Sequence, residues 1–477
     1  MMQSNINAGL QVVIGLGQSG LSAVQFLVNK GFEVAVTDGT DAPALANKLP
    51  EAVTMREFGG INESLLLKAS RVVISPGISL QQPAVANAIN AGINVVSDIQ
   101  LFHEALSEWD TPVPIVAITG SNAKSTVTTL VGEMAKNAGI NVGVGGNIGI
   151  PALNLLYDKK MQLAVLELSS FQLETVTDLN AQVATVLNMS PDHLDRHGDM
   201  LGYHQAKHRI FQGAKSVVVN REDELTIPLM RKNVKKISIG SNAPQSSLGN
   251  ESVEYGLITE ADGTTFLARA TAGNCEKLLN TAILKIKGQH NYLNALAALA
   301  LGELVNLPMD SMLNTLKDFA GLAHRCQYIV NKDGIDYFND SKGTNIGSTM
   351  AAIKGLGESY TAVNKSAKLL LILGGQAKGQ NFAEVVPLIN QFVSQLLFIG
   401  EDADLIYGQL KSAGLSHEIV CHQVGSLDKA IEKSKTLTAS SLSQVKAVLL
   451  SPACASFDQF NSYVERGDKF VKLVHAL

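Results

Sequence analysis

The sequence has few cysteines, a single tryptophan and no long apolar run, and these shortages argue against several classes of protein. The four cysteines are scattered without a C-x-x-C pair, which argues against a disulfide framework or a zinc ribbon. No apolar stretch approaches the roughly 20 residues that a membrane span needs. The first residues show no basic segment followed by an apolar one, so we expect no signal peptide and a cytoplasmic location.

An excess of charge of one sign is also missing. The chain has 38 Lys and Arg against 43 Asp and Glu, a net charge of −5. Nothing in this balance indicates nucleic acid or a membrane surface as a partner, although a local site for a polyanionic substrate is still possible. What the sequence does have is 477 residues with 46% hydrophobic content, which predicts an ordinary folded protein with more than one domain.

Short β-branched runs alternate with helical patterns from one end of the chain to the other. Most of the runs are continuously apolar, as parallel strands buried on both faces are, so the sequence predicts an α/β protein with mostly parallel sheets. The expected strands are Gln11–Ile14, Glu33–Thr37, Arg71–Ser75, Ile115–Thr119, Leu163–Leu168, Val183–Leu187, Ser216–Asn220, Leu369–Leu373, Leu396–Ile399 and Ala447–Leu450. Residues 240–275 are polar and rich in turn formers, so we expect surface hairpins there.

Two breaks in the pattern predict domain boundaries. Pro112 and Pro114 precede the fourth expected strand and are typical of a linker. Further on, a helical stretch ends at Gly321 and a strand-rich section follows. The sequence therefore predicts three domains, at residues 1–110, 111–321 and 322–477.

A glycine-rich turn follows the first expected strand. Gly15, Gly17 and Gly20 form a G-x-G-x-x-G pattern that opens a helix, and Asp38 ends the next strand. Such a turn lets backbone N–H groups approach a diphosphate at a helix N-terminus. The diphosphate could belong to NAD, FAD or another nucleotide, and a tight turn without a ligand is a further alternative. Ser75, after another strand, could line the same crevice.

A second loop, GSNAKST at residues 120–126, lies between an apolar strand and a helical pattern. It predicts a nucleoside-triphosphate site in which Lys124 contacts the β- and γ-phosphates and Ser125 holds Mg²⁺. Ala123 stands where loops of this class normally have glycine. If the loop needs a positive φ there, alanine costs on the order of 1 kcal/mol. We therefore predict a tolerated but weakened site.

Polar side chains then occur at the ends of successive strands. Glu167 lies in an otherwise apolar strand, where a carboxylate is costly unless it is paired or binds a metal. Asp192 and His193 follow the next strand, and Lys207 lies on a helix shortly after. Because ligand sites of α/β proteins form at the carboxyl ends of strands, these residues are predicted to converge.

Taken together, these segments resemble the Mur ligases, the ATP-dependent amide-forming enzymes of peptidoglycan precursor synthesis. The matching segments are GSNAKST (120–126), GGNIG (145–149), ELSSFQLE (167–174), Asp192-His193, Ala206-Lys207, GQHNYLNALAA (288–298), His324-Arg325, NDSKGTN (339–345), LGG (373–375) and SPACASFDQF (451–460). The resemblance spans the chain and is strongest to members that add D-glutamate to UDP-N-acetylmuramoyl-L-alanine. It implies a Rossmann-like N-terminal domain, a central P-loop ATPase-type domain that binds the mononucleotide, and a Rossmann-like C-terminal domain.

The resemblance also implies a site for ATP and two Mg²⁺ ions. One ion is expected on Ser125 and Glu167, and the second on His193 and on Lys207, which matches the lysine that the family carbamylates. The residues implied to contact ATP are Gly120, Ser121, Asn122, Ala123, Lys124, Ser125, Thr126, Asn291, Asn294, Arg325 and Asp340. The residues implied to act in catalysis are Lys124, His193, Lys207 and Lys342.

Substrate contacts follow from the same resemblance. The resemblance implies that the Gly15–Gly20 turn cradles the UDP diphosphate and uracil. Outside the D-glutamate pocket, the residues implied to contact substrate are Gly15, Gly17, Gln18, Ser19, Asp38, Ser75, Asn147 and Ser169. Those implied for D-glutamate are Lys342, Thr344, Lys378, Ser456 and Tyr463, with His324 and Lys342 closing over the substrates. Tyr463 stands where some relatives have phenylalanine. We expect a monomer.

Three alternatives stay open at this point. The chain could be a Mur ligase for another amino acid, or a related ligase that adds glutamate to folate. It could be an NAD-dependent oxidoreductase that uses the Gly15–Gly20 turn, although this leaves the Lys124 loop unexplained. It could also be a non-catalytic nucleotide-binding module, which gives no reason for Glu167, His193 and Lys207.

Overall fold

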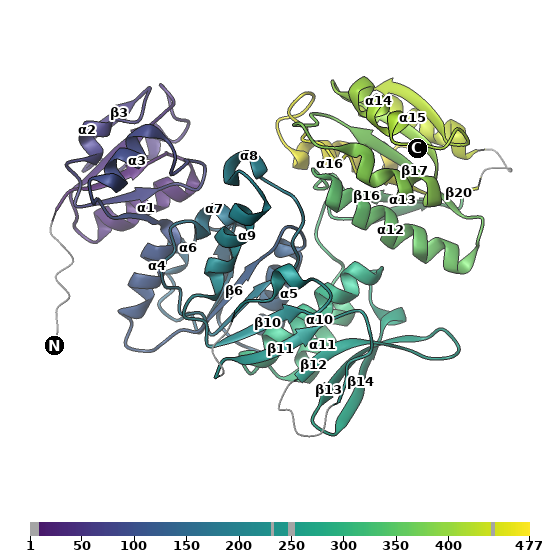
Figure 1. Cartoon of the computed structure of the whole chain (residues 1–477), viewed down its shortest axis with the longest axis horizontal. Helices are drawn as coiled ribbons and strands as arrows, with labels where there is room; N and C mark the ends of the chain where they lie inside the picture. The colour runs from purple at the N-terminus through teal and green to yellow at the C-terminus, as the bar shows by residue number, and fades with distance from the viewer. Residues whose placement is uncertain (1–8, 230–232, 247–252, 440–443) are drawn as a thin grey trace. The chain divides into compact units, whose positions relative to one another are not determined.

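The computed structural model describes residues 9–229, 233–246, 253–439 and 444–477. In these residues the strands form three sheets with helices packed against them (Figure 1). The chain divides into two compact units, Met1–Asn280 with Asn294–Leu316, and Thr281–Leu293 with Lys317–Leu477. The first unit holds two of the sheets and the second unit holds the third. The predicted α/β architecture is confirmed, whereas the domain boundaries near residues 110 and 321 stay predictions.

The first sheet has the strand order β3-β2-β1-β4-β5, and its strands are parallel. They are β1 (Gln11–Ile14), β2 (Val34–Asp38), β3 (Met55–Phe58), β4 (Arg71–Ile74) and β5 (Val95–Ser97). The helices are α1 (Gln18–Asn29), α2 (Glu63–Leu66), α3 (Pro83–Asn90) and α4 (Asp98–Ser107). The direction of winding reverses between β1 and β4, and such a switch point is where α/β sheets bind ligands. The turns that carry Gly15 and Ser75 leave the sheet there.

The second sheet has the order β14-β13-β12-β11-β10-β9-β6-β8-β7. Its strands are β6 (Ile115–Thr119), β7 (Val142–Gly146), β8 (Leu163–Glu167), β9 (Val183–Val186), β10 (Ser216–Asn220), β11 (Lys235–Ile239), β12 (Val253–Thr259), β13 (Thr265–Thr271) and β14 (Asn274–Asn280). The helices that follow these strands are α5 (Lys124–Asn137), α6 (Ala152–Leu155), α7 (Ser170–Leu173), α8 (Leu194–His197), α9 (Met200–His208), α10 (Gln289–Leu304) and α11 (Met309–Asp318). Strand β6 lies between β8 and β9, so the loop after it is at a second switch point.

The third sheet, in the second unit, has the order β15-β16-β20-β17-β18-β19. Its strands are β15 (Gln327–Lys332), β16 (Ile335–Asn339), β17 (Lys368–Gly374), β18 (Val393–Ile399), β19 (Val420–Gly425) and β20 (Val445–Leu450). Its helices are α12 (Ile346–Val363), α13 (Val386–Phe392), α14 (Ala403–Ser412), α15 (Leu427–Thr438) and α16 (Tyr463–His475). β15 pairs with β16 antiparallel, and the other strand pairs are parallel.

The cores follow from the continuous apolar strands. In β17, Leu369 and Leu371 belong to the cluster on one face of the sheet, whereas Leu370 and Ile372 belong to the cluster on the other. This alternation is the period of two of a strand buried on both faces. In the first unit a single cluster extends from Val13 of β1 to Ala184 of β9, so the first two sheets share a hydrophobic core.

Each strand predicted from the sequence is present, with ends that differ by at most three residues. The antiparallel strands were not predicted as part of a sheet. β12 and β13 form a hairpin, as expected for residues 240–275, and together with β14 they extend the second sheet. Residues 247–252 of that stretch lie outside the described part of the chain.

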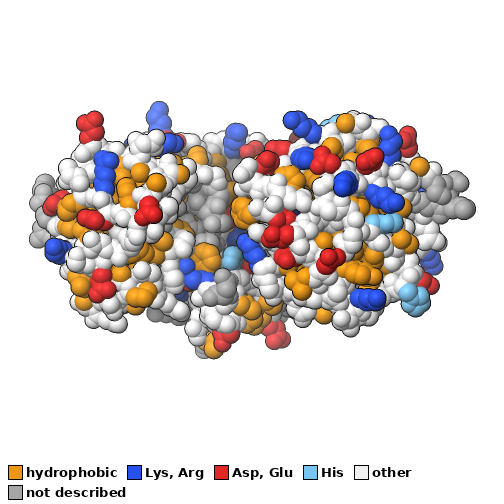
Figure 2. Space-filling view, turned by 90° about the horizontal axis from the view of Figure 1, so that it is seen from above, with side chains coloured by type: hydrophobic (Ala, Val, Ile, Leu, Met, Phe, Trp, Pro, Cys, Tyr) orange, Lys and Arg blue, Asp and Glu red, His pale blue; other side chains and the backbone are white. Residues whose placement is uncertain are grey.

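On the face drawn in Figure 2, acidic and basic side chains are interspersed among apolar ones. This mixture agrees with the balanced composition and offers no concentrated basic surface on the described residues of that face. None of the helices in the described ranges combines the length and the hydropathy that crossing a membrane requires.

Candidate functional site

The glycine turn after β1 is shaped by close backbone packing. Gly15 has a φ of +84°, which favours glycine. At Gly20, a Cβ atom would lie 1.9 Å from the carbonyl oxygen of Gly15, so only glycine fits. At Gly17, the N-cap of α1, a Cβ atom would meet open space. Two of the three glycines are therefore required by the fold of the turn itself.

Neighbouring strand ends fix this turn through hydrogen bonds. The Asp38 carboxylate accepts a hydrogen bond of 2.6 Å from the N–H of Leu16 and another of 2.8 Å from the N–H of Thr40. The Ser75 hydroxyl donates to the Gly15 carbonyl at 2.7 Å. Of the predicted substrate residues, Asp38 and Ser75 thus hold the backbone, whereas Gln18 is exposed at the start of α1.

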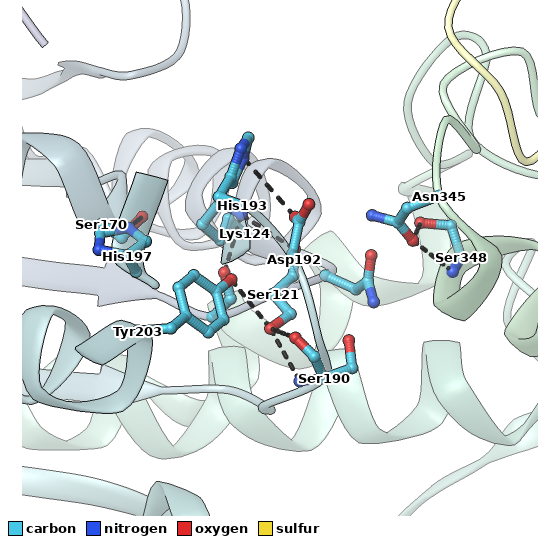
Figure 3. Close-up of polar contacts among 12 residues, drawn as sticks. Ser121, Lys124, Ser170, Ser190, Asp192, His193, His197, Tyr203, Asn345 and Ser348 are labelled. Atoms are coloured by element: carbon cyan, nitrogen blue, oxygen red, sulfur yellow. Dashed lines mark hydrogen bonds and ion pairs between the residues drawn. The ribbon is translucent and has the colours of Figure 1, made fainter. Parts of the chain in front are cut away.

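The loop after β6 begins at Gly120 and ends where α5 starts at Lys124. Ala123 is the N-cap of α5 and has a φ of +66°, so the conditional prediction of a left-handed residue is confirmed. The ammonium group of Lys124 donates to the carbonyls of Gly120, at 2.8 Å, and Ser121, at 3.0 Å. This lysine therefore lies along the loop that the sequence predicts as the phosphate site (Figure 3).

The loop is anchored to the segment after β9. The N–H of Asn122 donates to the Asn188 side chain at 2.8 Å, and the Asn188 amide donates back to the Asn122 carbonyl at 3.2 Å. The Ser121 hydroxyl donates to the Ser190 carbonyl at 3.0 Å and shares a hydrogen bond of 3.1 Å with the Tyr203 hydroxyl (Figure 3). These contacts fix the loop relative to the strand that precedes His193.

Lys207 lies buried behind the same loop. Its side-chain nitrogen is 2.8 Å from the Gly120 carbonyl and 3.3 Å from the Thr119 hydroxyl, and the residue is only 1% exposed. Burial, followed by the nearby charge of Lys124, lowers the pKa of Lys207 well below its ordinary value. This shift favours the neutral amine, which is the nucleophilic form of lysine.

Glu167, at the end of β8, is 2% exposed and incompletely hydrogen-bonded. One carboxylate oxygen accepts a hydrogen bond of 2.7 Å from the Asn147 amide, and the other, Oε2, has no hydrogen-bond partner. A buried carboxylate oxygen without a partner is costly, and coordination of a divalent cation removes that cost. The described residues hold no group of three or more His, Cys, Asp and Glu side chains arranged for a metal. A site with one carboxylate still fits Mg²⁺, which keeps water and phosphate oxygens as most of its ligands.

His193 immediately precedes α8 and has a φ of +53°. Its side chain is 49% exposed, and its Nε2 is 3.7 Å from the Asp192 carboxylate (Figure 3). Its ring contacts the Phe171 ring edge-on, with 4.8 Å between centroids. The left-handed backbone turns this imidazole out of the helix, where it is accessible to a ligand.

A cluster of charged residues supports the segment around His193. The Glu174 carboxylate accepts two hydrogen bonds from Arg196, at 2.7 and 3.3 Å, and Arg196 also donates to the Ile78 carbonyl at 2.7 Å. His197 is 3.0 Å from the Ser170 hydroxyl. Since Ile78 follows β4 of the first sheet, this arginine links the two sheets of the first unit.

The side chain of Ser169 caps the N-terminus of α7. Its hydroxyl accepts a hydrogen bond of 3.1 Å from the N–H of Gln172, and the Gln172 side chain accepts from the N–H of Ser169, which completes a capping box at α7. The predicted substrate contact at Ser169 stays a prediction.

In the second unit, Asp340 is buried at the end of β16. Its carboxylate accepts hydrogen bonds from the Ser451 hydroxyl, at 2.6 Å, and from the N–H of Cys326, at 3.0 Å. Burial raises the pKa of Asp340 to about 7, although these hydrogen bonds act in the opposite direction. The predicted role of Asp340 at ATP stays a prediction, as do those of Arg325, Asn291 and Asn294.

Two predicted D-glutamate residues place an ammonium group over an aromatic ring. Lys342 lies 3.9 Å from the centre of the Tyr463 ring, and Lys378, which has a φ of +49°, lies 5.5 Å from that of Phe457. Ser456, which directly precedes Phe457 in the sequence, is buried. Each ring attracts the ammonium group above it and limits the positions it takes, since a cation is attracted to the aromatic face.

His324 is buried in the same unit. It has a φ of +63°, and its Nδ1 is 2.9 Å from the Asn339 amide. Its Nε2 is 3.5 Å from the Asp468 carboxylate. Burial lowers the pKa of His324, so the imidazole is neutral at neutral pH. Its predicted role over the substrates stays a prediction, as does that of Thr344.

Sequence reasoning missed several residues that build these sites. Tyr203 gave no signal, because one aromatic residue in a helical pattern is normally a core residue. Glu174 ends the matching segment ELSSFQLE, and Arg196 follows His193 closely in the sequence, so their proximity to Glu167 and His193 was the available signal.

Three family models match successive parts of the chain. They are the Mur ligase MurD-like N-terminal domain at residues 10–97, the Mur ligase middle domain at residues 118–302, and the Mur ligase glutamate ligase domain at residues 324–454. Each match covers one of the three sheets. Together they account for most of the chain.

Curated relatives match over nearly the full length. The UDP-N-acetylmuramoylalanine--D-glutamate ligase of Psychrobacter arcticus is 64% identical over 98% of this chain and 95% of its own. The protein of the same name from Acinetobacter baylyi is 50% identical over 98% of each chain. Among solved structures, MurF from Acinetobacter baumannii matches with a TM-score of 0.58 at 15% identity, over 98% of this chain and 92% of its own. This structural likeness supports the fold alone.

Proposed function

Because this chain belongs to the Mur ligase family, we propose that it joins D-glutamate to UDP-N-acetylmuramoyl-L-alanine at the expense of ATP. The products are UDP-N-acetylmuramoyl-L-alanyl-D-glutamate, ADP and phosphate, in peptidoglycan precursor synthesis. The observation in the site that carries this proposal is the meeting of Lys124 and Lys207 at the Gly120 carbonyl, each with a hydrogen bond of 2.8 Å. The ammonium group of Lys124 suits a reaction in which negative charge gathers on phosphoryl oxygens, and Lys207 lies behind the same loop on α9.

The reaction has two steps. A carboxylate oxygen of the UDP substrate attacks the γ-phosphorus of ATP, the bond to the bridging oxygen of ADP breaks, and an acyl phosphate forms. The amino group of D-glutamate then attacks the acyl carbon, phosphate leaves with the electron pair of the broken C–O bond, and the amine loses a proton. Since neither step needs a covalent bond to the protein, the chain contributes positioning and charge.

Within this scheme Lys124 holds the phosphates, and the loop N–H groups at the start of α5 face them. Ala123 is compatible with this arrangement, because it adopts the left-handed backbone conformation that the loop requires, although that conformation is strained for alanine. The strain leaves the loop less stable than a glycine would make it, so we keep the prediction of a tolerated but weakened site.

Magnesium fits the residues near the loop. Ser125 and Glu167 would hold one ion, and the unpartnered Oε2 of Glu167 supports this assignment. His193 and Lys207 would hold a second ion. When bound, Mg²⁺ supplies positive charge that neutralises phosphoryl oxygens.

Lys207 is suited to hold a metal only after modification. Addition of its neutral amine to CO₂ forms a carbamate and releases a proton, which converts a basic side chain into an oxygen ligand. The burial of Lys207 and its lowered pKa support this modification, since only the neutral amine reacts with CO₂.

The two carboxylates of D-glutamate require two sets of donors. Lys342 and Lys378 supply charge, and Thr344, Ser456 and Tyr463 supply hydroxyl groups. Lysines held over aromatic rings support such a pocket, because the rings limit the side-chain freedom that binding would otherwise remove. We also keep the predictions that the protein is monomeric and works in the cytoplasm.

The choice of amino acid is tested by product analysis. The chain is incubated with ATP, Mg²⁺, UDP-N-acetylmuramoyl-L-alanine and one amino acid at a time, and products are identified by mass spectrometry. We expect a new amide with D-glutamate and none with L-glutamate, L-lysine or meso-diaminopimelate. A product with one of the other amino acids and none with D-glutamate would assign the chain to another member of the family.

A further inference from the structure

Asp98, the first residue of α4, is a buried carboxylate that none of the predicted roles explains. It directly follows β5 and is 1% exposed. Among the buried side chains that the structure describes, it alone leaves both carboxylate oxygens without a hydrogen bond of normal geometry. Burying a carboxylate without hydrogen bonds lowers the stability of the folded chain, so the presence of Asp98 at this position calls for an explanation beyond packing.

The carboxylate lies between the glycine turn of the first sheet and α7 of the second. The side chains of Ser19, the second residue of α1, and Gln172, on α7, face it closely enough to lower its pKa. Neither of them makes a hydrogen bond of normal geometry to it. Because α1 and α4 both begin beside Asp98, the partial positive charges of two helix N-termini also act there.

Burial is the largest influence on the pKa of Asp98 and raises it. Interactions with Ser19, Gln172 and the N–H of Ile99 lower the pKa, and the resulting value is about 6. The elements that pack most closely against α4 are α1, α6, α7 and β5, and their sequences contain no ionisable residue. The other titratable groups of α4 are His103 and Glu104, and those in the segments that flank α7 are Glu167, Glu174 and His197. None of these contributes to the shift at Asp98.

We propose that Asp98 is a positioning residue behind the glycine turn, whose protonation sets the orientation of the Ser19 hydroxyl and thereby the affinity for the diphosphate of the UDP substrate. This inference rests on the proposed function, which brings a diphosphate to the N-terminus of α1. When Asp98 is a carboxylate, it attracts the Ser19 O–H and adds a negative charge behind the turn. When it is a carboxylic acid, it donates to the Ser19 oxygen, and the Ser19 O–H is released to donate to a phosphate.

The sign of the pH dependence follows from linkage. A bound dianion disfavours the carboxylate, so it raises the pKa of Asp98 further, and substrate binding takes up a proton. Affinity is therefore highest where the acid form is populated, below about pH 6, and falls as the pH rises through the free and bound pKa values. The pKa of Asp98 is also higher in the folded chain, about 6, than its ordinary value of 3.8. The contribution of Asp98 to the free energy of unfolding is therefore present below about pH 3.8 and is lost as the pH rises through about 6.

The test is the pH dependence of substrate binding by the full chain and by Asp98→Asn, which has the same shape but no titration. Isothermal titration calorimetry with UDP-N-acetylmuramoyl-L-alanine, from about pH 5.5 to 8.5, suits this purpose, because its esterified phosphates and its carboxylate do not titrate in that range. We expect the Kd of the native chain to rise about threefold to tenfold across the range. Asp98→Asn should show less than half of that rise on a logarithmic scale and should bind more tightly than the native chain at pH 8. The matched control is Asp110→Asn, an exposed aspartate, which should follow the native curve.

Two further measurements separate positioning from a structural role. Ser19→Ala should bind more weakly but also lose most of the pH dependence, because it removes the hydroxyl through which Asp98 acts. In steady-state kinetics, Asp98→Asn should change the KM for the UDP substrate and leave those for ATP and D-glutamate unchanged. Equal pH dependence in Asp98→Asn and the native chain would overturn this inference alone. If the native chain does not bind the UDP substrate at any pH, the proposed function fails and this inference with it.

Discussion

The first unit contains two turns that the sequence predicts to bind phosphate from similar patterns, and the structure builds them differently. The turn at Gly15–Gly20 is held by neighbouring side chains that bond its backbone, Asp38 and Ser75. In the loop at Gly120–Thr126, by contrast, the side chain of Lys124 lies along the loop backbone, and Lys207 lies behind the loop. Both turns leave a strand at a switch point and open a helix, so the difference lies in the charge around them.

This difference matches two tasks. A turn that only holds a diphosphate needs N–H groups and a fixed shape, because the charge of its ligand does not change in the reaction. A loop at which a phosphoryl group is transferred must stabilise charge that develops in the transition state, and cations in a water-poor site do this. The comparison predicts that substitutions in the first turn weaken binding or folding, whereas those in the second reduce turnover.

The largest effect is expected from Lys124→Met. It removes the ammonium group that lies along the second loop and keeps a side chain of similar length, so kcat/KM should fall roughly 10³-fold with little loss of stability. Lys136→Met, an exposed lysine on the same helix, is the matched control and should leave turnover unchanged. Steady-state phosphate release measures both variants. A fall of less than tenfold for Lys124→Met would place the transferred charge elsewhere.

A somewhat smaller loss is expected from Lys207→Ala, about 10²-fold or more in kcat. If a carbamate at this position holds a metal, short carboxylic acids such as acetate should restore part of the activity, because they supply the missing oxygens in the vacated space. Lys215→Ala, an exposed lysine, serves as the control and should respond to neither change. Rescue by methylamine and not by acetate would instead mean that Lys207 acts as an amine or a cation.

Paired substitutions sharpen the account of the first turn. Gly20→Ala forces a Cβ to 1.9 Å from the Gly15 carbonyl, so it should lower the free energy of unfolding by about 1–3 kcal/mol and weaken UDP-substrate binding. Gly17→Ala meets open space and has a negative φ, so its effect on unfolding should stay within about 0.5 kcal/mol. Urea unfolding compares the two. Equal stabilities for both variants would show that the turn does not depend on this packing.

The smallest effect concerns Ala123. Replacing it by glycine relieves a left-handed alanine with a φ of +66°, which should raise the free energy of unfolding by about 1 kcal/mol and tighten nucleotide binding. Ala135→Gly, in the interior of the same helix, should change stability in the opposite direction. Lower nucleotide affinity together with lower turnover in Ala123→Gly would contradict the account of this residue.

The sequence predicted the parts of the fold that rest on continuous apolar runs. Strands such as Ile115–Thr119 and Ser216–Asn220 have the predicted ends, because strands buried on both faces contain little else than apolar residues. The edge strands β14 and β15 were missed, since their residues are mostly exposed or half-buried and their pattern is weak. Their place in a sheet comes from pairing with a neighbour, which local sequence does not encode.

The site was predictable where one residue type is unusual in its surroundings. Glu167 in an apolar strand and Lys124 in a glycine-led loop are such cases. Asp98 was not predictable, because an acidic residue in the first turn of a helix is ordinary, and its burial depends on Ser19 and Gln172 from distant parts of the chain. Ala123 lies between these cases: its identity was visible in the sequence, but its left-handed backbone depends on how the loop closes.

The central claim, that the second loop transfers a phosphoryl group to a carboxylate of the UDP substrate for attack by D-glutamate, is tested most directly by phosphate release from ATP. The native chain and Lys124→Met are assayed with Mg²⁺ and both substrates, and again with either one omitted. The account predicts rapid release by the native chain only when both substrates are present, and almost none by Lys124→Met. Release at the same rate without UDP-N-acetylmuramoyl-L-alanine or D-glutamate, or no release with both present, would contradict it.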